Sequence, residues 1–215
     1  MIDVILPCLD ESAAIPRVLA GLPPGARALV VDNGSTDGSA LVAEQLGASV
    51  IHCGAKGYGA ACHAGLLAAT SDVVAFCDCD DSIDLTGLMT LAAPVVAGRA
   101  DLAVGRRVPT TRGAWPSYAR LANAALAWRL RRIGLPVRDV SPLRIARRAD
   151  LLALDQQDRR SGYPLETLVL AGRAGWRVVE RDIAYRPRIG TSKVTGTVRG
   201  TAQAMRDMSG VLGRC

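Results

Sequence analysis

The stretch "VVAFCDCDDS", Val73–Ser82, decides how this chain must fold. Its first half is an apolar run whose length suits a buried strand, and its second half places Asp78, Asp80 and Asp81 directly behind that run. Carboxylates so close together repel one another, and burying them without positive charge is costly. The sequence therefore predicts a strand that ends at a site where carboxylates meet a cation.

Other apolar runs of strand length lie on both sides of this one, and stretches of helical character separate them. The expected strands are 2–6, 28–31, 49–51, 73–77 and 102–104, and the expected helices are 13–22, 39–46, 59–69 and 85–97. This alternation is typical of an α/β protein. We expect a three-layer α/β/α sandwich with a mainly parallel central sheet.

A single domain is expected, since 215 residues fit one domain. The composition changes after residue 105: arginines recur from 106 to 148, and Asp139 is the only carboxylate there. We therefore divide the domain into halves 1–105 and 106–215. In the second half we expect a long helix at 117–132, lesser elements at 143–146 and 163–174, a strand at 176–185 and a last helix at 197–212.

The net charge of +6 favours anionic partners, which include nucleic acid, phosphate-bearing small molecules and an acidic membrane surface. Six cysteines without a CxxC pair argue against a zinc knuckle and predict reduced thiols in a cytoplasmic protein. The first residues do not resemble a signal peptide, and no apolar run reaches the length of a spanning helix. Any membrane contact is therefore expected to be peripheral, at the inner face.

The acidic run is the strongest candidate for a metal site. Two carboxylates separated by one residue on a turn can present oxygens to Mg²⁺ or Mn²⁺, which also takes water and substrate phosphates as ligands. The alternative is that Asp81 or Ser82 caps the helix that follows.

Three further stretches are candidate binding segments. "VVDNGSTDGS", residues 30–39, puts Asp32 at the end of a strand, although a plain strand–turn–helix junction explains it equally well. "GAKGYGAACHAG", residues 54–65, is a glycine-rich entry to a helix whose N-terminus favours anions, with Lys56 as a candidate charge. "RPRIGTSK", residues 186–193, is either a solvated basic loop or a loop that closes over a diphosphate.

Together these stretches resemble the family-two inverting glycosyltransferases of the GT-A fold, and most of all the dolichyl- or polyprenyl-phosphate sugar synthases. The motifs that carry the resemblance are "ILPCLDE" (5–11), "VVDNGSTDGS" (30–39), "KGYGAACHAG" (56–65), "DCDD" (78–81), "GRR" (105–107) and "RPRIGTSK" (186–193). They occur in the family's order and extend over nearly the whole chain. Two positions differ from the usual pattern: Asn33 stands where a second aspartate is common, and "RDVSPLRIARR" (138–148) lacks the acceptor segment's glycine.

The resemblance implies a nucleoside-diphosphate sugar as donor. Pro7 and Glu11 would line the nucleoside pocket, and Asp32 would bond the base. Asp78 would face the sugar or nucleotide, and Asp80 would hold the metal on the diphosphate.

The resemblance also implies that the basic loop closes over the phosphates through Arg188, Ser192 and Lys193. The acceptor would be a polyprenyl phosphate or a hydroxyl group. A lipid phosphate needs no general base, and arginines of the second half, Arg106 and Arg144 among them, would bind it.

A hydroxyl acceptor would instead need a carboxylate to take its proton, for which Asp139 and Glu166 are the candidates. For Glu166 the alternative is a first-turn helix carboxylate.

Other classes fit less well. A nucleic-acid binder suits the charge but not the scarcity of aromatic residues, which make up 4% of the chain. A nucleotidyltransferase would carry a glycine-rich basic loop after the first strand, where this chain reads "PCLDES" (7–12). The last helix, if its apolar face is exposed, could serve a homodimer.

Overall fold

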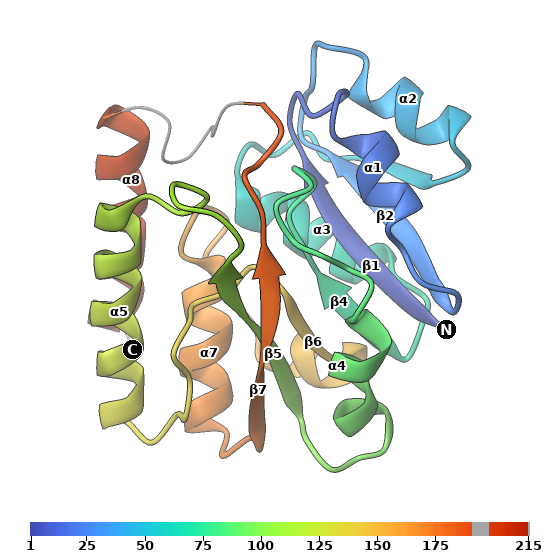
Figure 1. Ribbon diagram of the computed structural model, residues 1–215. Coiled ribbons are helices and arrows are strands. Elements are labelled where there is room, and N and C mark those ends of the chain that lie inside the picture. Colours follow the sequence, from blue (N-terminus) through green and yellow to red (C-terminus); the bar gives the residue numbers. More distant parts are fainter. Residues whose placement is uncertain (191–197, 215) are drawn as a thin grey trace.

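The computed structural model describes residues 1–190 and 198–214, and it contains a seven-stranded sheet with helices on both faces (Figure 1). The strands are β1 (Ile2–Cys8), β2 (Ala26–Asp32), β3 (Ser49–His52), β4 (Val73–Phe76), β5 (Leu102–Pro109), β6 (Arg144–Arg147) and β7 (Val178–Tyr185). The helices are α1 (Ile15–Ala20), α2 (Ser39–Gln45), α3 (Tyr58–Ala68), α4 (Leu88–Val96), α5 (Ser117–Arg132), α6 (Arg148–Ala153), α7 (Tyr163–Arg173) and α8 (Val198–Arg214).

The strand order is β3-β2-β1-β4-β6-β5-β7. All neighbouring strands pair in parallel except β6, which runs antiparallel to both β4 and β5. The predicted mainly parallel α/β/α fold is therefore confirmed. The direction of β6 and the existence of α6 were not predicted.

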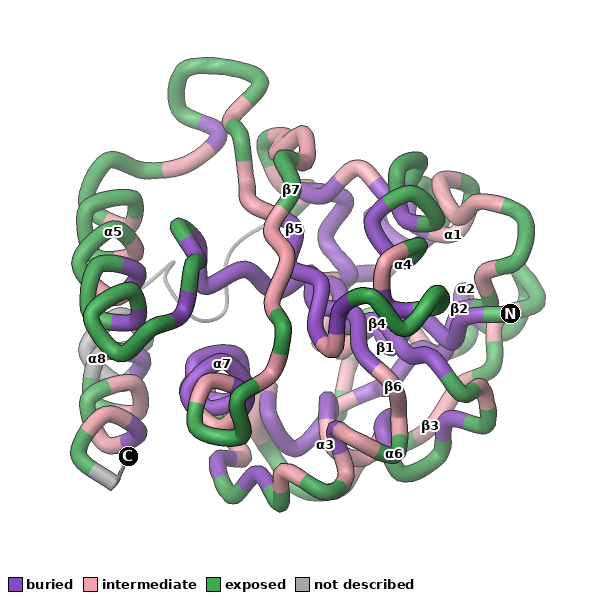
Figure 2. Tube along the Cα trace, turned by 90° about the horizontal axis from the view of Figure 1, so that it is seen from below, coloured by how far each residue is buried: buried purple, intermediate pink, exposed green. Residues whose placement is uncertain are grey.

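Two hydrophobic clusters hold helices to the two faces of the sheet. Alternation along β1 shows the division: Val4 and Leu6 belong to the cluster with α1, α2 and α4, while Ile5 belongs to the cluster with α3, α5, α6, α7 and α8. Figure 2 shows the buried strands between these layers. The core needs few aromatic rings because short aliphatic side chains fill both sides.

The candidate site lies where the chain reverses its direction across the sheet. From β1 the chain adds β2 and β3 on one side, and it then crosses to place β4 on the other side of β1. Ligand crevices in open α/β sheets form at such a switch point, outside the carboxyl ends of the strands. Pro7, near the end of β1, and Asp78, just beyond β4, therefore reach the same edge of the sheet.

No helix in the described part of the chain combines the length and the apolar character that a bilayer-spanning segment requires.

The close packing of α3 on the sheet gives a test of the fold. A Cβ added at Gly65 would lie 2.4 Å from Ile5 Cγ2 and 2.9 Å from Val31 Cγ2. We expect Gly65→Ala to destabilise the protein by about 2 kcal/mol, because the core must shift to admit a methyl group. Gly54→Ala, where a Cβ meets nothing within 4 Å, is the control and should be near neutral in urea unfolding. Equal stability of the two variants would contradict the packing described.

Candidate active site

The acidic turn, residues 78–82, begins directly after β4. Asp80 is 5% exposed, and its Oδ1 accepts a hydrogen bond from the Ser82 backbone N at 3.0 Å. Asp81 has a positive φ of 59°, which bends the chain sharply at this point. The helix-cap alternative is wrong, since α4 begins only at Leu88 behind Gly87 and has no side-chain cap.

Asp78 is the carboxyl group most affected by this turn. Burial raises the pKa of Asp78 to about 6, and the negative charge of Asp80 adds to the rise. The positive charges of Arg107 and Arg188 oppose it. The nearby arginines therefore offset only part of the rise in the pKa of Asp78, and further positive charge would stabilise its ionised form.

Arg188 supplies the nearest positive charge. Its Nη2 lies 2.7 Å from Glu11 Oε1, and its Nη1 lies 3.3 Å from Asp80 Oδ2. One guanidinium thus bridges the segment after β1 and the acidic turn after β4. Arg17 Nε makes a second contact, 3.0 Å from Asp81 Oδ2.

Backbone hydrogen bonds hold the start of the basic loop along the acidic turn. Arg186 N donates to Ser82 O at 2.8 Å, and Ile189 N donates to Asp80 O at 2.9 Å. The chain after β7 therefore follows residues 80–84, as a loop over a diphosphate requires. Ser192 and Lys193, also predicted to bind the phosphates, lie outside the described residues.

Asp32 ends β2 opposite Cys8 of β1, on the same edge of the sheet. Its Oδ1 accepts a hydrogen bond from Ser35 N at 3.1 Å, and its Oδ2 lies 3.4 Å from His52 Nδ1. Burial alone would raise the pKa of Asp32, but hydrogen bonds, those from Ser35 foremost, hold it below its usual value. Pro7, half-buried one residue before Cys8, completes the group predicted for the nucleoside.

The glycine-rich segment has a different role from the expected anion site. At the start of α3, Gly59 N donates to Arg160 O at 3.1 Å and Ala60 N donates to Arg159 O at 2.8 Å. A Cβ at Gly57 would lie 2.3 Å from Arg159 O. These glycines let the two backbones approach closely, so carbonyl groups occupy the helix N-terminus in place of a phosphate. Lys56, just before them, is exposed.

The contacts of Asn33 explain why an asparagine stands where the resembled family commonly has a second aspartate. Its Nδ2 donates to Ala55 O at 2.7 Å, and its Oδ1 accepts from Gly57 N at 2.8 Å. An aspartate could accept but not donate. Asn33 therefore fixes the glycine-rich segment beside Asp32.

The arginine beside the acceptor segment is Arg107, whereas the prediction named Arg106. Arg107 Nε and Nη2 donate to both oxygens of Asp139, at 2.9 and 2.7 Å, and Arg107 N adds a bond of 2.8 Å. The guanidinium also stacks over Trp115, 4.0 Å from the ring centroid. Arg106 pairs instead with Asp182, at 2.6 Å, because adjacent residues of a strand point to opposite faces.

The two predicted bases are both occupied. Asp139 is 1% exposed and engaged by Arg107 through both oxygens. Glu166, in the first turn of α7, accepts hydrogen bonds at its Oε2 from Gln157 N at 3.0 Å and Asp158 N at 2.7 Å. The structure thus favours the alternative for Glu166, a first-turn carboxylate that anchors the loop before its helix.

Arg144 is fully buried on β6, where it pairs with Phe76, the last residue of β4. Its Cζ lies 5.1 Å from the centroid of the Phe76 ring and 5.9 Å from that of Tyr163. None of its guanidinium nitrogens has a hydrogen-bond partner among the described residues. A substrate would have to enter the core to reach it, so an acceptor phosphate at the surface does not touch Arg144 in this conformation.

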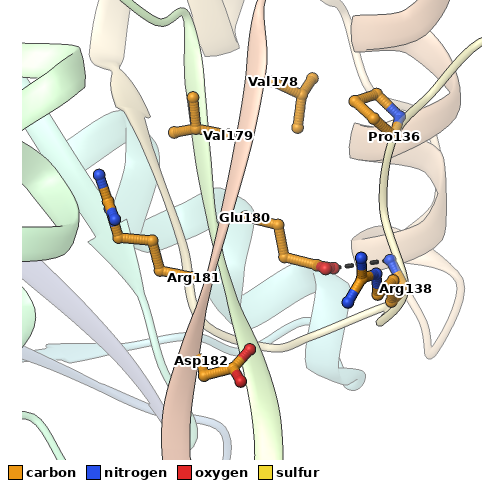
Figure 3. Close-up of a pocket in the computed structure, with 7 residues that line it drawn as sticks. All are labelled: Pro136, Arg138, Val178, Val179, Glu180, Arg181 and Asp182. Atoms are coloured by element: carbon orange, nitrogen blue, oxygen red, sulfur yellow. Dashed lines mark hydrogen bonds between the residues drawn. The ribbon is translucent and has the colours of Figure 1, made fainter.

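Glu180 was not predicted, yet it holds the acceptor segment in place. Its Oε1 accepts hydrogen bonds from Arg138 N at 2.7 Å and Asp139 N at 3.1 Å, and burial raises its pKa. Figure 3 shows Glu180 pointing from β7 toward Pro136 and Arg138, across a pocket of about 420 Å³. The pocket lies at the outer edge of β7 and not at the acidic turn. A lone glutamate in an alternating strand carries no sequence signal for this role.

The acidic turn suits a divalent cation that arrives with its own ligands. The described residues contain no group of three or more His, Cys, Asp or Glu arranged to hold a metal ion. Two carboxylates are nevertheless sufficient when a diphosphate and water fill the remaining positions. The raised pKa of Asp78 and the contact of Asp80 with a guanidinium both indicate that positive charge is favoured here.

Residues 3–145 match the model of glycosyl transferase family 2. An uncharacterized glycosyltransferase of Mycobacterium tuberculosis is 52% identical over 208 residues, which cover 96% of this chain and 95% of the relative. The dolichyl-phosphate hexose transferase of Haloferax volcanii is 30% identical, covering 93% and 89%. The fold is shared with glucosyl-3-phosphoglycerate synthase from M. tuberculosis in complex with Mn²⁺, UDP and glucosyl-3-phosphoglycerate, at a TM-score of 0.78 and 23% identity, covering 100% and 80%. The predicted GT-A fold is thereby confirmed.

The raised pKa of Asp78 predicts a pH-dependent stability. Between its usual value of 3.8 and about 6, the folded chain keeps a proton at Asp78 that the unfolded chain has lost, so this residue lowers stability as pH rises through that window. Asp78→Asn removes the titration. We expect the variant to be more stable than the parent by about 3 kcal/mol above pH 6 and equally stable below about pH 4. Urea unfolding across this range measures it, and a stability difference that does not change with pH would contradict it.

Proposed function

The chain belongs to glycosyl transferase family 2, and from this premise we propose that it moves a sugar, with inversion, from a nucleoside-diphosphate sugar to the phosphate group of a polyprenyl phosphate. The predicted family and enzyme class are confirmed by the match of residues 3–145. The donor, the acceptor and the metal are the parts that remain proposals.

The donor side rests on the groups gathered at the switch point of the sheet. Asp32, ionised and fixed by Ser35, would face the base, and Glu11, three residues after β1, is held by Arg188. Asp80, with Asp78, would hold Mg²⁺ or Mn²⁺, and the bound ion would stabilise the charge of the leaving diphosphate. Arg188 lies over the same turn and adds a forked donor for phosphate oxygens.

The acceptor side rests on one observation, the pairing of Asp139 with Arg107. A hydroxyl acceptor needs a carboxylate free to take its proton. Asp139 is held at both oxygens by Arg107, and Glu166 is held by two backbone amides. A phosphate is already an anion and attacks without a base. Arg107, stacked on Trp115 and oriented by Asp139, is pre-organised to bind it.

A polyprenyl phosphate is the phosphate acceptor best supported by the relatives, because the Haloferax protein named a dolichyl-phosphate hexose transferase matches this chain over nearly its full length. Glucosyl-3-phosphoglycerate synthase, named for a soluble phosphate-bearing product, shares the fold at 23% identity. In the proposed reaction a phosphate oxygen attacks the anomeric carbon from the face opposite the diphosphate. The new bond forms as the bond to the diphosphate breaks.

The test is a transfer assay. The protein is incubated with Mn²⁺, a panel of UDP- and GDP-sugars, and either a short-chain polyprenyl phosphate in detergent or 3-phosphoglycerate. We expect sugar to appear in the organic phase with the lipid, and Asp80→Asn to lower kcat/KM by about a thousandfold because the diphosphate is no longer neutralised. Transfer to 3-phosphoglycerate alone would overturn the lipid acceptor.

Two further variants separate a phosphate from a hydroxyl acceptor. If no base is used, Glu166→Gln should retain kcat within about threefold, and Asp139→Asn should raise KM for the lipid about tenfold because Arg107 loses its orientation. A loss of about a thousandfold or more in kcat for either variant, with folding intact by circular dichroism, would identify a base and contradict the proposal.

A further inference from the structure

The outward face of α5 carries large apolar side chains that the fold leaves exposed. Tyr118 is 55% exposed, Leu121 is 74% exposed and Trp128 is 54% exposed. Their spacing of three and seven residues puts them on one stripe of the helix. The opposite face, with Ala127 and Leu130, is fully buried against the protein. The exposed stripe, defined here as Tyr118, Leu121 and Trp128, therefore contributes nothing to the core.

Arginines of α5 flank this stripe. Arg120, Arg129 and Arg132 of α5 are exposed, and the guanidinium of Arg132 lies 5.0 Å from the Trp128 ring centroid. Residues 106–138 contain no aspartate or glutamate at all. An apolar stripe that contains tyrosine and tryptophan and is flanked by arginines is typical of a helix that lies in the interface of an anionic bilayer.

One contact just before α5 and one within it join the helix to the acceptor side of the proposed site. Trp115, two residues before the helix, stacks under Arg107. Asn123 Oδ1, within the helix, accepts a hydrogen bond from Val140 N at 2.9 Å. A surface that contacts α5 is therefore close in sequence and in contacts to the Arg107–Asp139 pair.

From these observations we infer that the exposed stripe of α5 docks the protein on an anionic lipid bilayer. Leu121 and Trp128 enter the headgroup boundary, and the flanking arginines meet lipid phosphates. This deepens the proposed function, on which it rests for its purpose, because it names the surface that brings the site to a lipid-borne acceptor. The binding itself requires neither donor nor transfer.

The experiment is vesicle co-sedimentation of the full chain. Vesicles of phosphatidylcholine alone are compared with vesicles that contain about 30% phosphatidylglycerol. The variant is Leu121→Glu, and the matched control is Leu41→Glu on α2, where the leucine is 58% exposed. In Figures 1 and 2, α2 and α5 lie at opposite ends of the molecule, so the control adds the same charge far from the stripe.

We expect the parent protein and Leu41→Glu to bind anionic vesicles at least tenfold more tightly than neutral ones, and Leu121→Glu to lose at least tenfold on the anionic vesicles. Thermal unfolding of both variants should match the parent, because both leucines are exposed. Failure of the parent to bind, or equal binding by the two variants, would overturn the inference. A parent dimer that becomes monomeric on Leu121→Glu, without vesicle binding, would assign the stripe to a second copy and also overturn it.

The same proteins distinguish this inference from the proposed function. Transfer to a detergent-dispersed polyprenyl phosphate without vesicle binding would leave the proposed function standing and reject the docking surface. Vesicle binding through Leu121 without transfer to any polyprenyl phosphate would do the reverse.

Discussion

The placement of two carboxylates directly after β4, on the half-buried Asp78 and the buried Asp80, is the constraint on which the rest of the site depends. Burial raises the pKa of Asp78 to about 6, and repulsion by the negative charge of Asp80 adds to the rise. Arg188 is shared between Asp80 and Glu11, and backbone bonds from residues 186 and 189 keep it there. The turn is thus tolerated because a distant segment brings charge to it, and it remains under-neutralised in a way that a metal–diphosphate ligand would relieve.

Close backbone contacts at the start of α3 are one of the places where the two halves of the chain meet. The start of α3 touches the loop at Arg159 and Arg160 with no room for a Cβ at Gly57 or Gly59. Glu166 fixes the same loop from the other side through the amides of residues 157 and 158. A glycine-rich segment that resembles a phosphate cradle therefore joins the first half of the chain to the second, and Glu166 supports that junction.

The sequence predicted those parts of the fold in which local pattern and tertiary packing agree. The buried parallel strand β4 reads as a continuous apolar run, and β1 reads as one interrupted only by Asp3. The acidic residues behind β4 lie at the switch point of the sheet, where the sequence predicted a site. The antiparallel direction of β6 could not be predicted, because its four residues, which include a buried arginine, form no pattern that distinguishes parallel from antiparallel pairing. The choice between Arg106 and Arg107 depended on which face of β5 each residue occupies. The role of Glu180 depended on its hydrogen bond with Asp139, 41 residues away. Neither is a property of local sequence.

The pairing of Arg107 with Asp139 links the fold to the choice of acceptor. Asp139 is buried and both of its oxygens accept hydrogen bonds from Arg107, so neither oxygen is free to bind an acceptor hydroxyl. The same pair holds the Arg107 guanidinium in one orientation. Asp139 accepts its hydrogen bonds, and the rings of Trp115 and Tyr185 pack against it. Trp115 and Asp139 flank α5 in the chain. The segment that orients Arg107 therefore also contains the exposed stripe. Under the proposed function, one segment would therefore recognise both the anionic headgroup of the acceptor and the bilayer around it.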